Sequence, residues 1–82
     1  MITSAQLRSA RHALKISVDH LSELSAVSAR TIKRMESEEG VPSSTPPNVA
    51  AVKAALESAG IEFIGTPDNA PGIRIHKTTQ SK

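Results

Sequence analysis

Apolar residues recur every three or four positions along the first part of the chain, which is the spacing of helices that bury one face. A repeated start signal divides this part. Thr3, Ser17 and Ser28 each follow an apolar residue, and each precedes another apolar residue four positions later. A hydroxyl residue in that setting is typical of a helix N-cap with a hydrophobic staple. The pattern predicts helices over about 4–14, 18–25 and 29–37.

A loop and a fourth helix are predicted next. Residues 38–47 are rich in Gly, Pro and Ser, which favours a loop. Within them, Thr45 followed by Pro46 matches an N-cap and first helical position, where proline's missing N–H is not needed. Apolar residues then recur at helical spacing as far as Ala59, and Gly60 is a common helix terminator.

The remaining apolar residues alternate with polar ones, as in short strands. This alternation covers 61–64 and 73–76, and the residues between them include two prolines and two glycines. An antiparallel hairpin centred near Asp68 is therefore expected. Its register would place Ile61 opposite Ile75, Phe63 opposite Ile73, and Glu62 opposite Arg74.

The third predicted helix separates its charges from its apolar side chains. Ile32 and Met35 fall on one face, and Arg30, Lys33 and Arg34 fall on the opposite one. A basic face is most often only solvated. Here, however, the helix follows another short helix after a tight turn, which is the arrangement of helix-turn-helix DNA readers. We therefore expect a recognition helix over about 28–37.

The order of eight residues in this region resembles that of a known family: Ser17, Leu21, Leu24, Val27, Ser28, Thr31, Ile32 and Glu36. The family is that of the lambda-repressor and Cro-like helix-turn-helix regulators, also called the xenobiotic-response-element type, and the resemblance covers about 2–36 and, more loosely, 40–75. It implies a four-helix DNA-binding domain. Together with the patterns above, this predicts a mainly α protein with the DNA-binding domain over 1–60, a short C-terminal β-hairpin or strand pair over 61–77, and a flexible tail over 78–82 of small and polar residues.

The expected DNA contacts divide between bases and phosphates. Arg30 and Arg34 suit bidentate hydrogen bonds to guanine, Lys33 suits a base or a phosphate, and Ala29 suits a thymine methyl. Hydroxyl groups and helix-terminus amides suit phosphates, which position a protein without reading sequence. The expected phosphate contacts are Ser17, Val18, Ser28, Thr31 and Ser37.

Three positions depart from the family pattern. Lys15 and Ala26 stand where glycine is usual, at places that favour a positive φ. Each therefore carries about 1 kcal/mol of strain or reshapes its turn. Val18 stands where a glutamine often contacts a phosphate.

Two charged residues fall on core-facing sides of their helices. Arg11 lies on the apolar side of the first helix, and Glu36 lies beside Ile32 on the third. The family resemblance implies that Arg11 and Glu36 form an ion pair. The alternative is that both side chains extend to water.

Composition limits the possible classes of protein. Eighty-two residues with a net charge of +2 form one small domain with a modest core. The sequence has no cysteine and no apolar run of membrane-spanning length, so we expect a cytoplasmic protein without disulfides. The three histidines fall on different elements, and no nucleophile motif or phosphate loop is visible. No enzymatic activity, metal or cofactor is expected.

The function expected from these features is that of a transcriptional regulator, of the repressor kind, which binds a near-palindromic operator as a homodimer. One alternative is an antitoxin that also binds a toxin, and another is a protein-interaction module. The hairpin supplies an apolar face for the dimer, although it could instead fold onto the fourth helix of its own chain. The expected dimer contacts are Ile61, Phe63, Ile73 and Ile75.

Overall fold

The chain folds into four helices followed by a two-stranded antiparallel hairpin. The computed structural model describes residues 2–38, 40, 42 and 46–76. The predicted N-cap Thr45 and the predicted tail 78–82 lie outside these residues. The elements are α1 (Ser4–Leu14), α2 (Val18–Ser25), α3 (Ala29–Ser37), α4 (Pro46–Ser58), β1 (Ile61–Thr66) and β2 (Asn69–Ile75).

The first three helices begin where the hydroxyl pattern predicts. The side chains of Thr3, Ser17 and Ser28 each accept a hydrogen bond from the backbone N–H three residues later. At Thr3 the capping box is complete, because the Gln6 side chain in turn accepts from the Thr3 N–H at 2.8 Å. The local sequence therefore specifies all three helix starts.

The ends of α1 and α2 keep the left-handed backbone despite lacking glycine. Lys15 has φ 59° and Ala26 has φ 61°, and both act as helix C-caps. Of the two outcomes expected at these positions, strain rather than a reshaped turn is therefore observed. A side chain with a Cβ in this region costs roughly 1 kcal/mol.

Replacing Lys15 or Ala26 with glycine is expected to raise the free energy of unfolding by about 1 kcal/mol each, because the strain is relieved and both residues are exposed. Urea melts measure the change. Ala50→Gly is the matched control: this alanine is exposed within α4, where glycine should instead destabilise by about 0.5–1 kcal/mol. If all three variants lower the free energy of unfolding equally, Lys15 and Ala26 are not strained.

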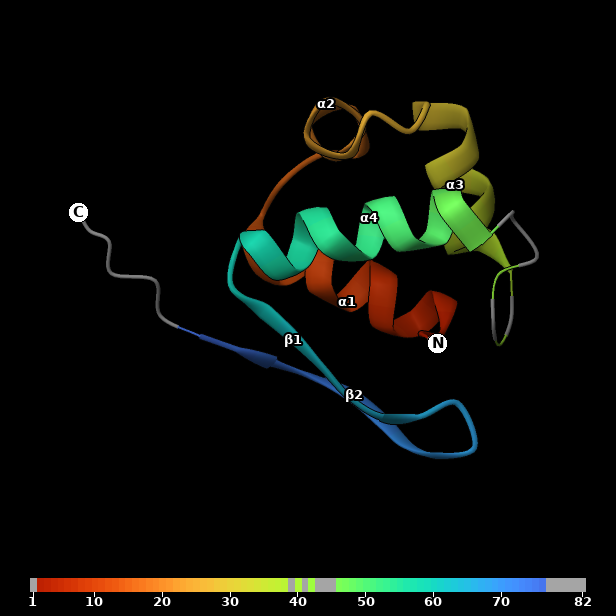
Figure 1. Cartoon of the computed structure of the whole chain (residues 1–82), viewed down its shortest axis with the longest axis vertical. Helices are drawn as coiled ribbons and strands as arrows, with labels where there is room; N and C mark the ends of the chain where they lie inside the picture. The colour runs from red at the N-terminus through yellow and green to blue at the C-terminus, as the bar shows by residue number, and fades with distance from the viewer. Residues whose placement is uncertain (1, 39, 41, 43–45, 77–82) are drawn as a thin grey trace.

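The core lies between the helices and one face of the hairpin. In Figure 1, α1 and α4 lie side by side, α2 lies above them, and the hairpin lies below. The four helices and β1 contribute buried apolar side chains, and β2 adds the half-buried Ile73, so the hairpin and the helices share one core. The largest of these side chains are Ile2, Leu7, Leu21, Ile32, Met35, Val52 and Leu56.

The hairpin has the predicted register but longer strands. Ile61 pairs with Ile75, Glu62 with Arg74, and Phe63 with Ile73. The loop expected between the strands is mostly strand, because a bulge near Gly65 carries the pairing on to the turn. Gly65 has φ 76°, and a Cβ there would lie 2.2 Å from the Ala70 carbonyl oxygen, so only glycine fits.

The four expected dimer-contact residues differ in how far their own chain buries them. Ile61 is only 2% exposed and belongs to the chain's own core, while Phe63 and Ile73 are half-buried against it. β1 packs against α4 and β2 against α1, as in the alternative arrangement. Of these four residues, only Ile75, at 57% exposure, leaves most of its apolar side chain accessible.

Candidate nucleic-acid interface

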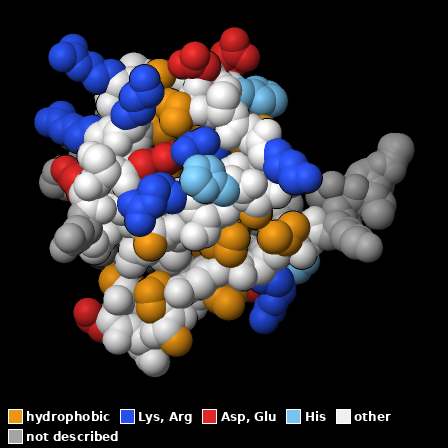
Figure 2. All heavy atoms as spheres, turned by 180° about the vertical axis from the view of Figure 1, so that it is seen from behind, with side chains coloured by type: hydrophobic (Ala, Val, Ile, Leu, Met, Phe, Trp, Pro, Cys, Tyr) orange, Lys and Arg blue, Asp and Glu red, His pale blue; other side chains and the backbone are white. Residues whose placement is uncertain are grey.

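α3 presents a basic face to solvent. Arg30, Lys33 and Arg34 are all exposed, whereas Ile32 and Met35 are fully buried. Ala29, the expected thymine contact, is half-buried at the start of the helix. In Figure 2, Lys and Arg side chains gather at the upper left of the molecule, and apolar ones gather toward the hairpin. The expected base contacts thus share one accessible helix face.

The hydroxyl groups expected to contact phosphates already have local roles. Ser17 and Ser28 accept N-cap hydrogen bonds, and Ser28 also donates to the Thr31 hydroxyl at 2.9 Å. The hydroxyl hydrogen of Thr31 is therefore available to a phosphate. Ser37 donates its hydroxyl to the Arg34 carbonyl at 3.0 Å, so it has no donor to offer unless that bond breaks.

The N-terminus of α2 is a poor site for a phosphate. The Val18 side chain packs against the core and has no polar atom, so only its backbone N–H could donate. The next residue, Asp19, is exposed and acidic in the first helical turn. Its carboxylate would repel a phosphate there, and the sequence reasoning missed this effect. The basic face of α3 is therefore the better surface for an anion.

An ion pair anchors the C-terminal end of α3 to α1. Arg11 Nε and Nη2 donate to the two Glu36 carboxylate oxygens at 2.7 and 2.8 Å, as the family resemblance implies. The two side chains are 14% and 9% exposed. Hydrogen bonding to Glu36 raises the pKa of Arg11 despite the opposing effect of burial, so this guanidinium stays charged. Bidentate geometry fixes the distance and the angle between the two helices.

A second arginine holds the same helix end, and the sequence reasoning missed it. Arg8 lies three residues before Arg11 in α1, and its Nη1 donates to the Glu36 backbone carbonyl. Unlike α1 and α2, α3 ends at Glu38 in an extended conformation, without a left-handed cap. A cation beside a helix's last carbonyls satisfies them and favours the helix dipole. The spacing of Arg8 and Arg11, three residues apart in α1, places both on one helix face and is the sequence feature that indicates this shared role.

Arg8→Ala is expected to lower the free energy of unfolding by about 1 kcal/mol, because α3 loses this charged donor at its last turn. Hydrogen exchange of the α3 amides should accelerate most near Glu36. Arg74→Ala is a matched control, since Arg74 also makes a charged hydrogen bond but lies in the hairpin. Unchanged exchange in α3 of the Arg8 variant would show that the contact does not hold the helix end.

The three histidines belong to different parts of the fold. His12 is in α1, His20 is in α2, and His76 follows β2, where its Nε2 lies 2.7 Å from Glu62 Oε1. This contact is the main reason that the pKa of Glu62 is lowered. Among the described residues, no three His, Asp or Glu side chains are grouped as metal ligands would be. Over the same ranges, no helix is long and apolar enough to cross a bilayer.

Comparisons with known proteins leave the family open. No family model matches the sequence, and no curated protein is similar to it. The function therefore has to be inferred from the site itself.

Proposed function

We propose that the chain is a sequence-specific DNA-binding transcriptional regulator, in which α3 enters the major groove and two copies bind a near-palindromic operator. One observation carries this proposal: the exposed face of α3 holds Arg30, Lys33 and Arg34, while its opposite face is locked into the core. A short helix that follows another after a tight turn fits the major groove in this way.

The chemistry of this face suits base reading. Arg30 and Arg34 lie one helical turn apart, and each guanidinium can donate two hydrogen bonds to the O6 and N7 atoms of a guanine. Lys33 lies between them and suits a base or a phosphate. Ala29 suits a thymine methyl, and the free hydroxyl hydrogen of Thr31 suits a phosphate.

The support behind α3 favours specific rather than loose binding. A reading helix must be held within a fraction of an ångström, which requires rigid packing and hydrogen bonds behind it. Ile32 and Met35 are fully buried. Arg11 and Arg8 both bond to Glu36, which lies in the last turn of α3.

Selection of bound sites from random duplex DNA tests the proposal. We expect enrichment of a site with two inverted half-sites about one helical turn apart. The Arg30→Ala/Arg34→Ala double variant, carried through the same selection, should enrich no such site. Failure of the wild-type protein to enrich any sequence would overturn the proposal, and identical enrichment by the double variant would place the reading surface elsewhere.

A further inference from the structure

The outer edge of β2 is an unpaired sheet edge. His76 N–H donates to the Gly60 carbonyl at 2.7 Å, so residues 60 and 76 form a hydrogen-bonded pair. Because such pairs alternate along an antiparallel ladder, Ile75 and Ile73 direct their backbone N–H and C=O groups away from β1. Among the described residues, no other element bonds to these groups. Pro71 is on the same strand; it has no N–H, so it offers this edge only its carbonyl group.

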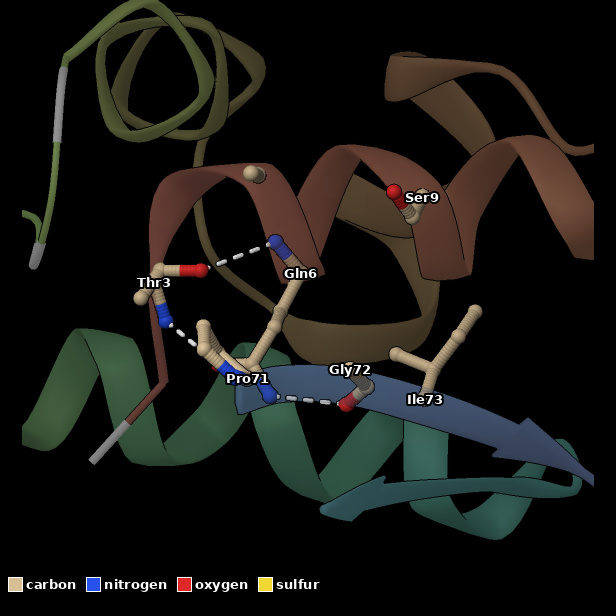
Figure 3. Close-up of a pocket in the computed structure, with 7 residues that line it drawn as sticks. Thr3, Gln6, Ser9, Pro71, Gly72 and Ile73 are labelled. Carbon is tan, nitrogen blue, oxygen red and sulfur yellow. Dashed lines mark hydrogen bonds between the residues drawn. The ribbon is translucent and has the colours of Figure 1, made fainter. Parts of the chain in front are cut away.

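A groove runs beside this edge, between β2 and α1 (Figure 3). Its volume is about 240 Å³, and an apolar cavity of about 150 Å³ can already hold benzene. Gln6 also lines it, and the side-chain amide of Gln6 already bonds to Thr3, Ile64 and Gly72. The groove therefore suits an aliphatic side chain; its walls include Ala5 and Ser9 of α1 and Pro71, Gly72 and Ile73 of β2.

The same strand carries a side chain that fits such a groove. Ile75 is 57% exposed, and it lies two residues beyond Ile73 on the same face of the sheet. Pro71, in the groove wall, lies two residues before Ile73. Ile75 and Pro71 are therefore equally far from Ile73 along the strand, one on each side of it.

We propose that a second copy of this chain covers this edge, with the two β2 strands paired antiparallel about a two-fold axis at Ile73. This pairing joins two hairpins into a four-stranded sheet. Ile75 of each copy then lies opposite Pro71 of the other and enters its groove, which makes the contact self-complementary. The proposal names the dimer contact of the proposed regulator, and it rests on that function only for the need to engage two half-sites.

Charge disfavours the neighbouring register toward the C-terminus. An axis at Arg74 would place two guanidinium groups directly opposite each other, and like charges in that position destabilise a sheet. An axis at Gly72 would place Ile75 opposite Asn69, away from the groove wall at Pro71. An axis at Ile73 places Arg74 opposite Gly72 instead. Arg74 also keeps its own partner, Glu62, at 3.3 Å.

The location of the hairpin leaves the proposed reading surface open. In Figure 1 the hairpin lies on the opposite side of α1 and α4 from α2, and α3 is away from both strands. Pairing through β2 therefore does not cover the basic face of α3 in either copy.

Disulfide trapping tests the register. The chain has no cysteine, so introduced thiols are the only ones present. In the proposed dimer, Gly72 of one copy and Arg74 of the other form a non-hydrogen-bonded pair, with Cα atoms about 4.5 Å apart and within disulfide reach. A Cβ at Gly72 meets its nearest atom, in Ile64, at 3.5 Å, so G72C fits.

Oxidation of a mixture of the G72C and R74C proteins is expected to give a cross-linked dimer in high yield, and either protein alone should give little. Efficient cross-linking of R74C alone would move the axis to Arg74 and overturn the register. No cross-linking in the mixture would overturn the pairing itself.

Sedimentation without DNA tests the contact independently. The wild-type protein is expected to be a dimer and Ile75→Glu a folded monomer, because Ile75 is exposed and its replacement removes no core contact. Leu24→Glu is the matched control, since Leu24 is a similarly exposed apolar residue in α2 and its variant should remain dimeric. A monomeric wild type, or a dimeric Ile75→Glu, would overturn the proposal.

The two proposals fail in different ways. If the dimer contact is wrong, the Ile75→Glu variant binds the selected operator as the wild type does. If the reading function is wrong, no operator is selected, while disulfide trapping and sedimentation still report the dimer.

Discussion

Replacing Arg11 with alanine is expected to lower the free energy of unfolding by about 3 kcal/mol or more. The Glu36 carboxylate, 9% exposed, would lose both of its guanidinium hydrogen bonds and remain as an uncompensated charge among buried side chains. It would also lie at the C-terminal end of α3, where the helix dipole disfavours a negative charge.

Glu36→Ala is expected to lower the free energy of unfolding somewhat less than Arg11→Ala does. The freed guanidinium keeps its hydrogen bond to the Ile16 carbonyl at 3.0 Å, so it retains one acceptor. Urea melts of both single variants and the double variant measure the coupling. The double variant should lose much less than the sum of the two single losses.

The exposed pair of Lys53 and Glu57 in α4 provides the matched control. Its atoms are 3.9 Å apart, and the side chains are 37% and 48% exposed. Glu57→Ala is therefore expected to cost only about 0.3–0.5 kcal/mol. Similarly small, additive losses at Arg11 and Glu36 would mean that the pair contributes no more than this surface contact.

The elements of this fold follow from local sequence rules. Each of the first three helix starts is set by a hydroxyl residue and the residues within four positions of it, and the structure has those caps. The hairpin register follows from strict alternation, because a slip of one residue would turn Ile61 and Phe63 out of the core. Both rules depend on neighbours in sequence or on a two-residue period.

Contacts between distant segments were harder to predict. Gln6 reads as a capping-box residue, and it is one; yet its amide also donates to Ile64 and Gly72 in the hairpin, 58 and 66 positions away. Nothing in the local pattern of α1 encodes that second role. The length of the strands was also missed, since a bulge allows pairing across residues whose prolines and glycines favour a loop.

At the candidate interface, the exposed face of α3 was predictable and its polar partners were not. The helical period separates Arg30, Lys33 and Arg34 from Ile32 and Met35, and burial follows that division. Whether a hydroxyl hydrogen is free depends on local geometry: Ser37 donates its hydrogen within its own helix, whereas Thr31 accepts from Ser28. Two hydroxyl residues of one helix can therefore differ in whether they offer a phosphate a donor.

The remaining prediction concerns the reading surface. Arg30→Ala and Arg34→Ala are each expected to weaken binding to the selected operator by about 1–3 kcal/mol and to relax the preference at one base pair of each half-site. Both side chains are exposed and on the face opposite the core, so the melting curve should not change. Fluorescence anisotropy on the operator and on random duplex DNA, at several salt concentrations, measures both effects.

The salt dependence separates base reading from charge neutralisation. Loss of a guanine contact weakens binding to the operator far more than binding to random DNA. Loss of a phosphate contact weakens binding to both DNAs alike and reduces the slope of the salt dependence by about one. Lys53→Ala is the control, because it removes one cation from α4 and leaves α3 intact. If Arg30→Ala and Arg34→Ala weaken operator and random DNA equally, these arginines only neutralise phosphates; if neither variant differs from Lys53→Ala, α3 is not the surface that meets DNA.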